Sequence, residues 1–332
     1  MRLRRGFTLI EVMVATAVLA VLLVLTLSVT NEVSRGVGSA MQKVDSFESA
    51  RAGFEMMSQG LGNAVLNTYW DYYDANRLPR TQANAASFSP DRYGRQSDLN
   101  FQIRDLANGS SLPVGWSTVS HGVFFQSPRG TENSTPSDVL GAEGYFVAFG
   151  QDPAFPNLAA LNNPKRFRLF RWSQPSSELD VNPATGKINA TPTAAPWITP
   201  TTNVHPVADN IIALIARVPS TSAKSADSFF WNSQQVWSTG DQPNQMHQMP
   251  PLVELTMVAI DAKASSRLIE QVANAEAAYA ALGLPNPATL FNDPSKYEDD
   301  LQKIETGLAN KGVDYQILAL SVPVNGSRWN PN

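Results

Sequence analysis

The residues able to carry out acid–base, nucleophilic or metal chemistry are few in this chain and widely spaced. Its three histidines, His121, His205 and His247, have no HxxxH or HxH spacing of the kind that binds a metal. Cysteine is absent, which excludes a thiolate nucleophile, a thiolate metal site and a disulfide. GxSxG, P-loop and GxGxxG motifs are missing as well. The sequence therefore predicts that the protein is not an enzyme and that its histidines are packing or surface residues.

Acidic side chains are the remaining candidates for a site. Asp71, Asp74, Asp91 and Asp98 are spread through one polar, aromatic-rich stretch, and residues 298–300 are three consecutive acids. Carboxylate oxygens are ligands that calcium prefers, but neither group has the regular spacing of a calcium loop. We expect no cofactor and solvated carboxylates, with a bound calcium ion as the alternative.

Composition limits the class of partner. Hydrophobic residues make up 43% of the chain and charged residues 16%, which is below the usual charged share. This balance is typical of an extracytoplasmic protein with long surface loops. The formal net charge is −4, so no broad basic face is available for phosphates. We therefore expect no nucleic-acid partner.

An apolar run close to the N-terminus contains a single acid. The chain begins MRLRRGFTLIEVMVATAVLAVLLVLTLSVT, and residues 12–30 carry no charge. As a helix these residues span ~28 Å, close to the ~30 Å hydrocarbon core of a bilayer. The arginines at positions 2, 4 and 5 precede the run, so the positive-inside tendency keeps this end cytoplasmic and sends the rest outward. The segment is therefore sufficient for one membrane pass.

Glu11 separates the possible interpretations of this run. An ordinary secretory signal has a shorter apolar region, although Ala15, Ala17 and Ala20 offer small residues for cleavage. A plain membrane anchor leaves Glu11 unexplained, because a charge inside a spanning helix costs ~2.5 to 3.5 kcal/mol at its centre and less near the interface. Both alternatives stay open, and the acid is expected to need a partner.

Residues 5–12, RGFTLIEV, follow a basic leader and open the uncharged run. Together these features resemble the processing motif of type IV prepilins and type II secretion pseudopilins. The resemblance implies that a prepilin peptidase cuts after Gly6 and methylates Phe7, the new first residue. It also implies that Glu11 pairs with the Phe7 amine of a neighbouring subunit, which would offset part of the cost of burying the acid. The implied partners are that peptidase, other pilin-like subunits and the inner membrane.

Further stretches are similar to a narrower family, the Verru_Chthon cassette protein C proteins, which are prepilin-type proteins of Verrucomicrobia and relatives. The stretches are LNTYWDY at 66–72, RYGRQSDL at 92–99, HGVFFQ at 121–126 and PLVELTMVAI at 251–260. The resemblance spans nearly the whole chain except the segments at 175–206 and 222–251, whose role it leaves open. A weaker similarity to J-type minor pseudopilins around Arg51 and Phe54 covers chiefly the helix.

The pattern beyond the membrane run predicts a helix and then a sheet. Apolar residues recur every three or four positions from 33 to 65, which favours a continued helix packed on one side. Glycines at 36, 38, 53, 60 and 62 weaken that helix, so two separate helices are the alternative. Strands are predicted at 97–103, 119–127, 143–151, 166–173, 210–218, 252–260 and 314–322.

Other elements complete the expectation. Helices are predicted at about 265–282 and 295–310, and exposed loops at 175–206 and 239–251. The aromatic cluster of Tyr69, Trp70, Tyr72 and Tyr73 is expected to be a lid over the core between helix and sheet, with an exposed patch as the alternative.

The sequence as a whole predicts an α+β, pilin-like fold. Its expected parts are a leader at 1–6, the transmembrane half of the helix at 7–30, its outer half at 31–66, and an extracytoplasmic sheet-rich domain at 67–332 with inserted loops and helices at about 265–310. The expected function is a structural or assembly subunit, of the minor pilin or pseudopilin type, of a type IV pilus-like or type II secretion-like filament. The alternative is a stand-alone, membrane-anchored protein that binds an envelope or extracellular ligand, and an anchored hydrolase has no group of residues behind it.

Overall fold

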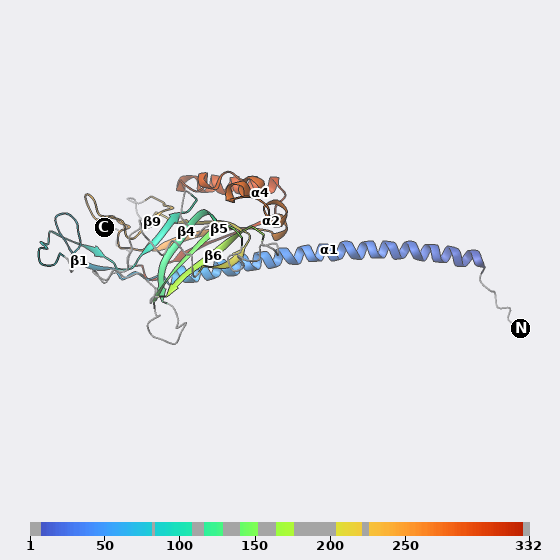
Figure 1. Ribbon diagram of the computed structural model, residues 1–332, viewed down its shortest axis with the longest axis horizontal. Coiled ribbons are helices and arrows are strands. Elements are labelled where there is room, and N and C mark those ends of the chain that lie inside the picture. Colours follow the sequence, from blue (N-terminus) through green and yellow to red (C-terminus); the bar gives the residue numbers. More distant parts are fainter. Residues whose placement is uncertain are drawn as a thin grey trace. The chain divides into compact units, whose positions relative to one another are not determined.

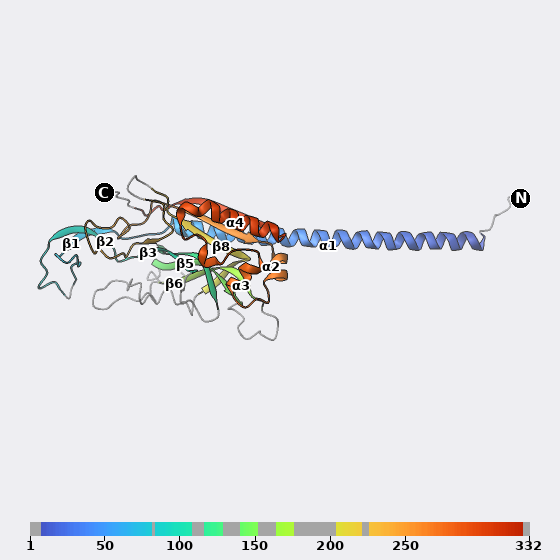
Figure 2. The same ribbon diagram turned by 90° about the horizontal axis from the view of Figure 1, so that it is seen from above.

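The computed structural model describes residues 8–81, 84–107, 116–128, 140–151, 164–175, 204–220 and 226–327. In these residues a long helix precedes a domain of strands and short helices, as Figures 1 and 2 show. By its contacts the chain forms two units, Met1–Asp45 and Ser46–Asn332. The first contains the whole uncharged run at residues 12–30, and the second contains the strands.

Helix α1 (Leu9–Gly62) is continuous, so the alternative of two separate helices is wrong. It ends at Gly62 rather than at residue 66. Residues 46–62 place Ala50, Phe54, Met57 and Leu61 in the main hydrophobic core. A Cβ on Gly53 would lie 3.2 Å from the Cβ of Ala208, so glycine permits the close approach of helix and strand. Packing thus holds the helix together despite the lower helix propensity of glycine.

A six-stranded antiparallel sheet has the order β7-β6-β5-β4-β3-β9. Alternate residues of its strands enter two separate clusters, because successive side chains point to opposite faces. Phe125 and Tyr145 belong to the main core, whereas Phe124 and Phe146 belong to a second cluster on the other face. The strands are β3 (Phe101–Asp105), β4 (Ser117–Pro128), β5 (Leu140–Gly150), β6 (Arg166–Pro175), β7 (Val204–Asp209) and β9 (Trp231–Asn232).

A smaller antiparallel sheet has the order β11-β10-β8. Its strands are β8 (Ile211–Arg217), β10 (Leu252–Ile260) and β11 (Tyr315–Pro323). Strands β1 (Tyr69–Tyr73) and β2 (Arg92–Gln96) form a separate two-stranded ribbon, which Figure 1 shows beyond the C-terminal end of α1. Figure 1 shows the late helix α4 (Tyr297–Asn310) and residues 46–62 of α1 on opposite sides of the strands.

The late helices differ in part from the prediction. Helix α4, preceded by a 3₁₀ turn at Pro294–Lys296, confirms the helix expected at 295–310. The single helix expected at 265–282 is wrong, because α2 (Ala262–Leu268) and α3 (Ala275–Ala281) are separate. Asn274 caps α3 by accepting a hydrogen bond from the Ala277 N–H, and a cap residue starts a new helix.

Several strand and loop boundaries also need correction. The strand predicted at 97–103 is replaced by β3, which begins at Phe101, and β1 and β2 were not predicted. Strand β7 begins at Val204, inside the loop predicted at 175–206, and residues 176–203 lie outside the described part of the chain. The loop predicted at 239–251 is not exposed throughout, since residues 246–250 are buried. The order of a long apolar helix, a sheet-rich region and late helices is the α+β arrangement expected.

Candidate functional site

Glu11 lies in the first turn of α1 and forms reciprocal hydrogen bonds with Thr8. The Thr8 N–H and the Thr8 hydroxyl each donate to Glu11 Oε2 at 2.9 Å. In return the Glu11 N–H donates to Thr8 Oγ1 at 3.4 Å. This is a capping box, in which residues three apart satisfy the free N–H groups of a helix start. Glu11 therefore orders its own helix before any neighbour is present.

Part of the Glu11 carboxylate remains available. The side chain is exposed, and no residue in the described part of the chain donates a hydrogen bond to its second oxygen, Oε1. That oxygen can accept from a cation supplied by another molecule. Gly6 and Phe7, the residues of the predicted cleavage site, lie outside the described residues.

The uncharged run of α1 has no polar side chain that needs water. Apolar residues of the run are exposed to a similar extent, as for Val12 at 52% and Leu19 at 62%. Its four hydroxyl side chains donate to backbone carbonyls of the same helix, which satisfies them in an apolar medium. The pairs are Thr16 to Met13, Thr26 to Leu22, Ser28 to Val24 and Thr30 to Thr26. Length and composition make α1 capable of crossing a membrane.

The acidic residues singled out in the sequence make separate local contacts. Asp71 accepts from the Tyr72 N–H and Asp74 from the Leu78 N–H, both at 2.8 Å. Asp98 accepts from Asn67 at 3.1 Å. Among the described residues, no three metal-ligating side chains form a group that could hold a metal ion. The arrangement gives a calcium site no support.

The remaining acidic residues, Asp91 and those at 298–300, also make separate local contacts. Asp91 forms an ion pair with Arg92 at 2.9 Å. Of the three consecutive acids at 298–300, Asp300 is buried, accepts from the Phe291 N–H at 2.8 Å and pairs with Lys303 at 2.7 Å. Asp300 therefore joins α4 to the segment before it, which is a structural role.

The histidines do not come together. His205 is exposed on β7, and His247 is buried in the segment before β10. His121 is buried in β4, where its Nδ1 accepts from the Ala216 N–H and its Nε2 lies 3.1 Å from the Phe291 carbonyl oxygen. These partners assign the proton to Nε2, and burial lowers the pKa of the imidazole. His121 thus connects β4 to β8 and to the segment that precedes α4.

The aromatic cluster is not a lid over the main core. Trp70 and Tyr72 are 47% and 50% exposed on the β1–β2 ribbon, where both contact Tyr93. Tyr73 is buried in a small separate cluster with Trp237 and Met246. The expectation of a lid is wrong, and the alternative of an exposed patch describes Trp70 and Tyr72.

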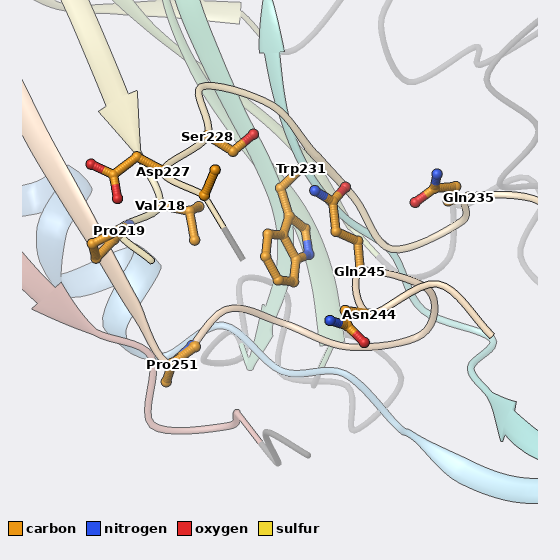
Figure 3. A pocket seen from close by; sticks show the side chains of 10 residues that line it. Val218, Pro219, Asp227, Ser228, Trp231, Gln235, Asn244, Gln245 and Pro251 are labelled. Carbon is orange, nitrogen blue, oxygen red and sulfur yellow. The ribbon is translucent and has the colours of Figure 1, made fainter. Parts of the chain in front are cut away.

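A cavity of about 380 Å³ lies beside the end of β8, and Figure 3 shows its lining. Trp231, Val218 and Pro251 supply apolar surface, and Asn244 and Gln245 supply amide groups. The Trp231 ring lies among these residues in Figure 3, and its Nε1–H donates to the Gln248 carbonyl at 2.9 Å. This volume suits a small ligand.

Comparison with known proteins locates the recognisable part of the chain at its start. A family model described as the prokaryotic N-terminal methylation motif matches residues 1–27. No curated protein and no solved structure matches. The motif indicates a precursor of the type IV pilin or pseudopilin type, a class processed by prepilin peptidase and assembled with other pilins. Such proteins are typically structural subunits, and the apolar part of α1 is consistent with single-pass anchoring in the inner membrane.

Thr8 is the functional residue that sequence reasoning missed. Its signal was present, because Thr-x-x-Glu ahead of an apolar run is the pattern of a capping box. Glu11, by contrast, was found because a charge at the edge of a spanning segment requires an explanation.

Proposed function

We propose that the protein is a structural subunit of the minor pilin or pseudopilin type. In this proposal prepilin peptidase cuts after Gly6, and the mature chain enters or initiates a type IV pilus-like or type II secretion-like filament. The observation that carries the proposal is the N-terminal methylation motif at residues 1–27. The continuous helix α1, which begins within the motif at Leu9, supports the proposal, since such a helix both anchors a subunit and packs against its neighbours.

The assembly step in this proposal is a charge pair between subunits. The N-terminal amine of one subunit's Phe7 approaches Oε1 of a neighbour's Glu11, the oxygen not used by Thr8. The capping box holds the carboxylate at the start of the helix, so less side-chain freedom is lost on pairing. Because the surroundings are apolar, a pair in the correct stagger is favoured strongly over an unpaired acid.

The proposal also covers the orientation of the chain in the membrane and its membership of a narrower family. The arginines at 2, 4 and 5 support a cytoplasmic N-terminus before cleavage and a periplasmic or extracytoplasmic domain after residue 30. The resemblance to the Verru_Chthon cassette protein C family supports membership of that group. Its matching stretches lie on or beside strands β1, β2, β4 and β10, so they consist largely of sheet residues outside the leader.

The test is incorporation of the full chain into assemblies with other pilin-like subunits in cells with and without prepilin peptidase. With the peptidase, we expect a shorter chain that cross-links to other prepilin-type proteins. Without it, the chain should stay full length and unassembled in the membrane. A chain that is never shortened and never cross-links would contradict the proposal.

A second candidate is a stand-alone anchored protein that binds a small ligand outside the membrane. The cavity beside Trp231 favours it, because its apolar surface, its amide groups and the Asp227 carboxylate, which pairs with Arg217, together suit a hydroxylated ligand. This candidate requires no cleavage after Gly6 and no charge at Glu11. Processing therefore separates the two candidates.

A further inference from the structure

The two edge strands of the three-stranded sheet, β8 and β11, differ in whether their outward backbone groups have hydrogen-bond partners. At the β8 edge, side chains bond three of the backbone groups that point away from β10. Two of these side chains come from a bulge in β4, where the register with β5 shifts between Val119 and Gly122 and Ser120 has a φ of 56°. The bonds are Leu214 N–H to Ser120 Oγ at 2.9 Å, Ala216 N–H to His121 Nδ1 at 3.1 Å and Tyr279 hydroxyl to Ile212 O at 2.6 Å.

The β11 edge has no such closure. The Asp261 N–H donates to Asp314 O and the Val324 N–H donates to Pro251 O, so even-numbered residues of this strand bond toward β10. In an antiparallel pair the alternate residues then point their N–H and C=O groups outward. For β11 these are the odd-numbered residues 315–321. Within the described ranges no residue forms a hydrogen bond with them.

From Tyr315 to Val322 this edge also lacks the usual protection against strand pairing, and its one proline, Pro323, is the last residue of the strand. Its sequence, YQILALSVP, contains no charge, and its register with β10 runs without a bulge. Ala319, Leu320 and Ser321 are exposed in the middle of the strand. Natural edges are normally blunted by charges, proline or bulges, and a long uncharged edge without them is a template for another strand.

One of the two outer edges of the larger sheet, β7, shows that protection in the same molecule. Strand β7 contains Pro206, which has no N–H to donate, and its register with β6 shifts between Leu169 and Phe170. Asp209 at its end forms an ion pair with Arg168 at 2.9 Å. Strand β7 therefore carries features that hinder pairing with a further strand, whereas residues 315–322 of β11 carry none. We call this the open edge.

We propose that the β11 edge binds an extended strand of a different pilin-like subunit, an inference that rests on the proposed function. The outward N–H and C=O groups are complementary to an extended backbone, which is the basis of strand addition. The uncharged side chains of β11 favour a partner strand without charges at the paired positions. The contact would fix which subunit sits next to this one.

A second copy of the same chain fits this edge poorly. Ser46 Oγ donates to Ile260 O, opposite the start of β11, and the Asn325 N–H donates to Gly62 O just past its end. Strand β11 therefore runs in the same direction as residues 46–62 of α1. Copies whose helices run parallel hold their β11 strands parallel, so antiparallel pairing of two β11 strands is excluded. Strand β7 of a second copy is a poor partner because of Pro206 and its register shift, and β9 is only two residues long.

The test uses a single cysteine in the full-length chain within its native membranes. Because the chain has no cysteine, Ser321→Cys places one thiol on the open edge, and Ser238→Cys is a matched exposed control away from it. With a thiol-linked photo-crosslinker, Ser321→Cys should give an adduct with a different pilin-like chain at about tenfold the yield of Ser238→Cys. Equal yields, no adduct, or an adduct with a second copy of this chain would overturn the proposal.

A second variant tests the backbone ladder itself. Ala319→Pro in the Ser321→Cys background removes one outward N–H and keeps the bonds to β10, so adduct yield should fall about tenfold at an unchanged melting temperature. If that variant melts early, Ala319→Lys, which adds a charge to the edge, decides the matter. Wild-type adduct yield in a folded edge variant overturns the edge proposal. If such cells still show cleavage after Gly6 and dependence on Glu11, the proposed function stands without it, whereas an uncut chain means that the proposed function has failed.

Discussion

Helix α1 meets two different surroundings along its length. In residues 12–30 it is apolar on every side, and its hydroxyl groups bond back to its own carbonyls. In residues 46–62 one face is buried in the core, and the other carries polar pairs such as Arg51 and Glu55 at 3.1 Å. The first stretch suits lipid or a bundle of helices, and the second suits a sheet on one side and water on the other.

The family match ends close to the end of the first of these two stretches. The methylation motif covers residues 1–27, and no curated protein or solved structure matches the chain. The features general to the class therefore lie in the first part of the helix. What is particular to this protein lies in Ser46–Asn332, where the cavity, the aromatic ribbon and the open β11 edge are found.

The largest effect is expected at Glu11. Glu11→Leu removes the acid from the apolar stretch, so a plain anchor should insert equally well or better. An assembling subunit loses the counter-ion of its neighbour's Phe7 amine, a loss that can reach several kcal/mol where the pair is desolvated. We expect the variant to be cut and to reach the membrane but to be absent from filaments and from cross-linked neighbours.

Glu11→Gln separates the charge from the cap. Glutamine can still accept from the Thr8 N–H, so the capping box is retained while the charge is lost. A defect equal to that of Glu11→Leu, measured by the same cross-linking, assigns the effect to electrostatics. If both variants assemble like the wild type, the pairing role of Glu11 is wrong.

The second prediction concerns the buried part of α1. A truncated protein that begins at Glu32 should be soluble and melt cooperatively, because Ser46–Asn332 has its own core. Met57 is fully buried in that core and its neighbour Met56 is 45% exposed. In urea unfolding, Met57→Ala should lower the free energy of unfolding by ~2 to 5 kcal/mol and Met56→Ala by less than ~0.5 kcal/mol. Equal effects would show that this half of the helix is not packed as described.

The third prediction is a pH dependence confined to the domain, since residues 8–45 contain no histidine. Burial lowers the pKa of His121 in the folded state, although the Asp105 carboxylate opposes this shift. As pH falls below the unfolded value of ~6.5, the unfolded chain takes up the proton first, so stability is full above ~6.5 and falls below it by up to ~1.4 kcal/mol per pH unit. Unfolding of the truncated protein between pH 7.5 and 5 measures this slope. The His121→Gln variant should have a lower free energy of unfolding at every pH, and that free energy should depend less on pH between 7.5 and 5. An unchanged slope would contradict the assignment of the pH dependence to His121.

The smallest effect is expected for the cap. Thr8→Val keeps the shape of the side chain and removes the hydroxyl that bonds Glu11 Oε2 and accepts from the Glu11 N–H. Losing a cap costs about 1 kcal/mol, so cross-linking to neighbours should fall by less than about tenfold. A complete loss of assembly would mean that Thr8 itself contacts a neighbouring subunit.

The sequence predicted those elements whose local pattern agrees with their environment. Strand β10 lies at the predicted residues 252–260, because its apolar run is bounded by proline and by the cap of α2. Helix α4 was predicted from a segment rich in Glu, Asp and Lys, and three acids lie in its first turn, where they interact favourably with the helix dipole. Glu11 was found because its chemistry conflicts with its surroundings.

The missed elements depend on distant contacts. Strand β7 contains Pro206, a residue that argues against a strand, and it pairs only at the edge of β6. The buried segment 246–250 is polar in part, and its place is set by bonds such as Thr68 Oγ1–H to His247 O at 2.7 Å. The open edge of β11 was invisible, because the sequence does not say which strand lies at the edge of a sheet.

The measurement that tests the account most directly is the mass of the mature N-terminal peptide, taken from cells that contain the native processing machinery. Processing by prepilin peptidase predicts a chain that begins at Phe7 and carries one added methyl group on its amine. Retention of Met1, or a cut beyond Ala20, would contradict it.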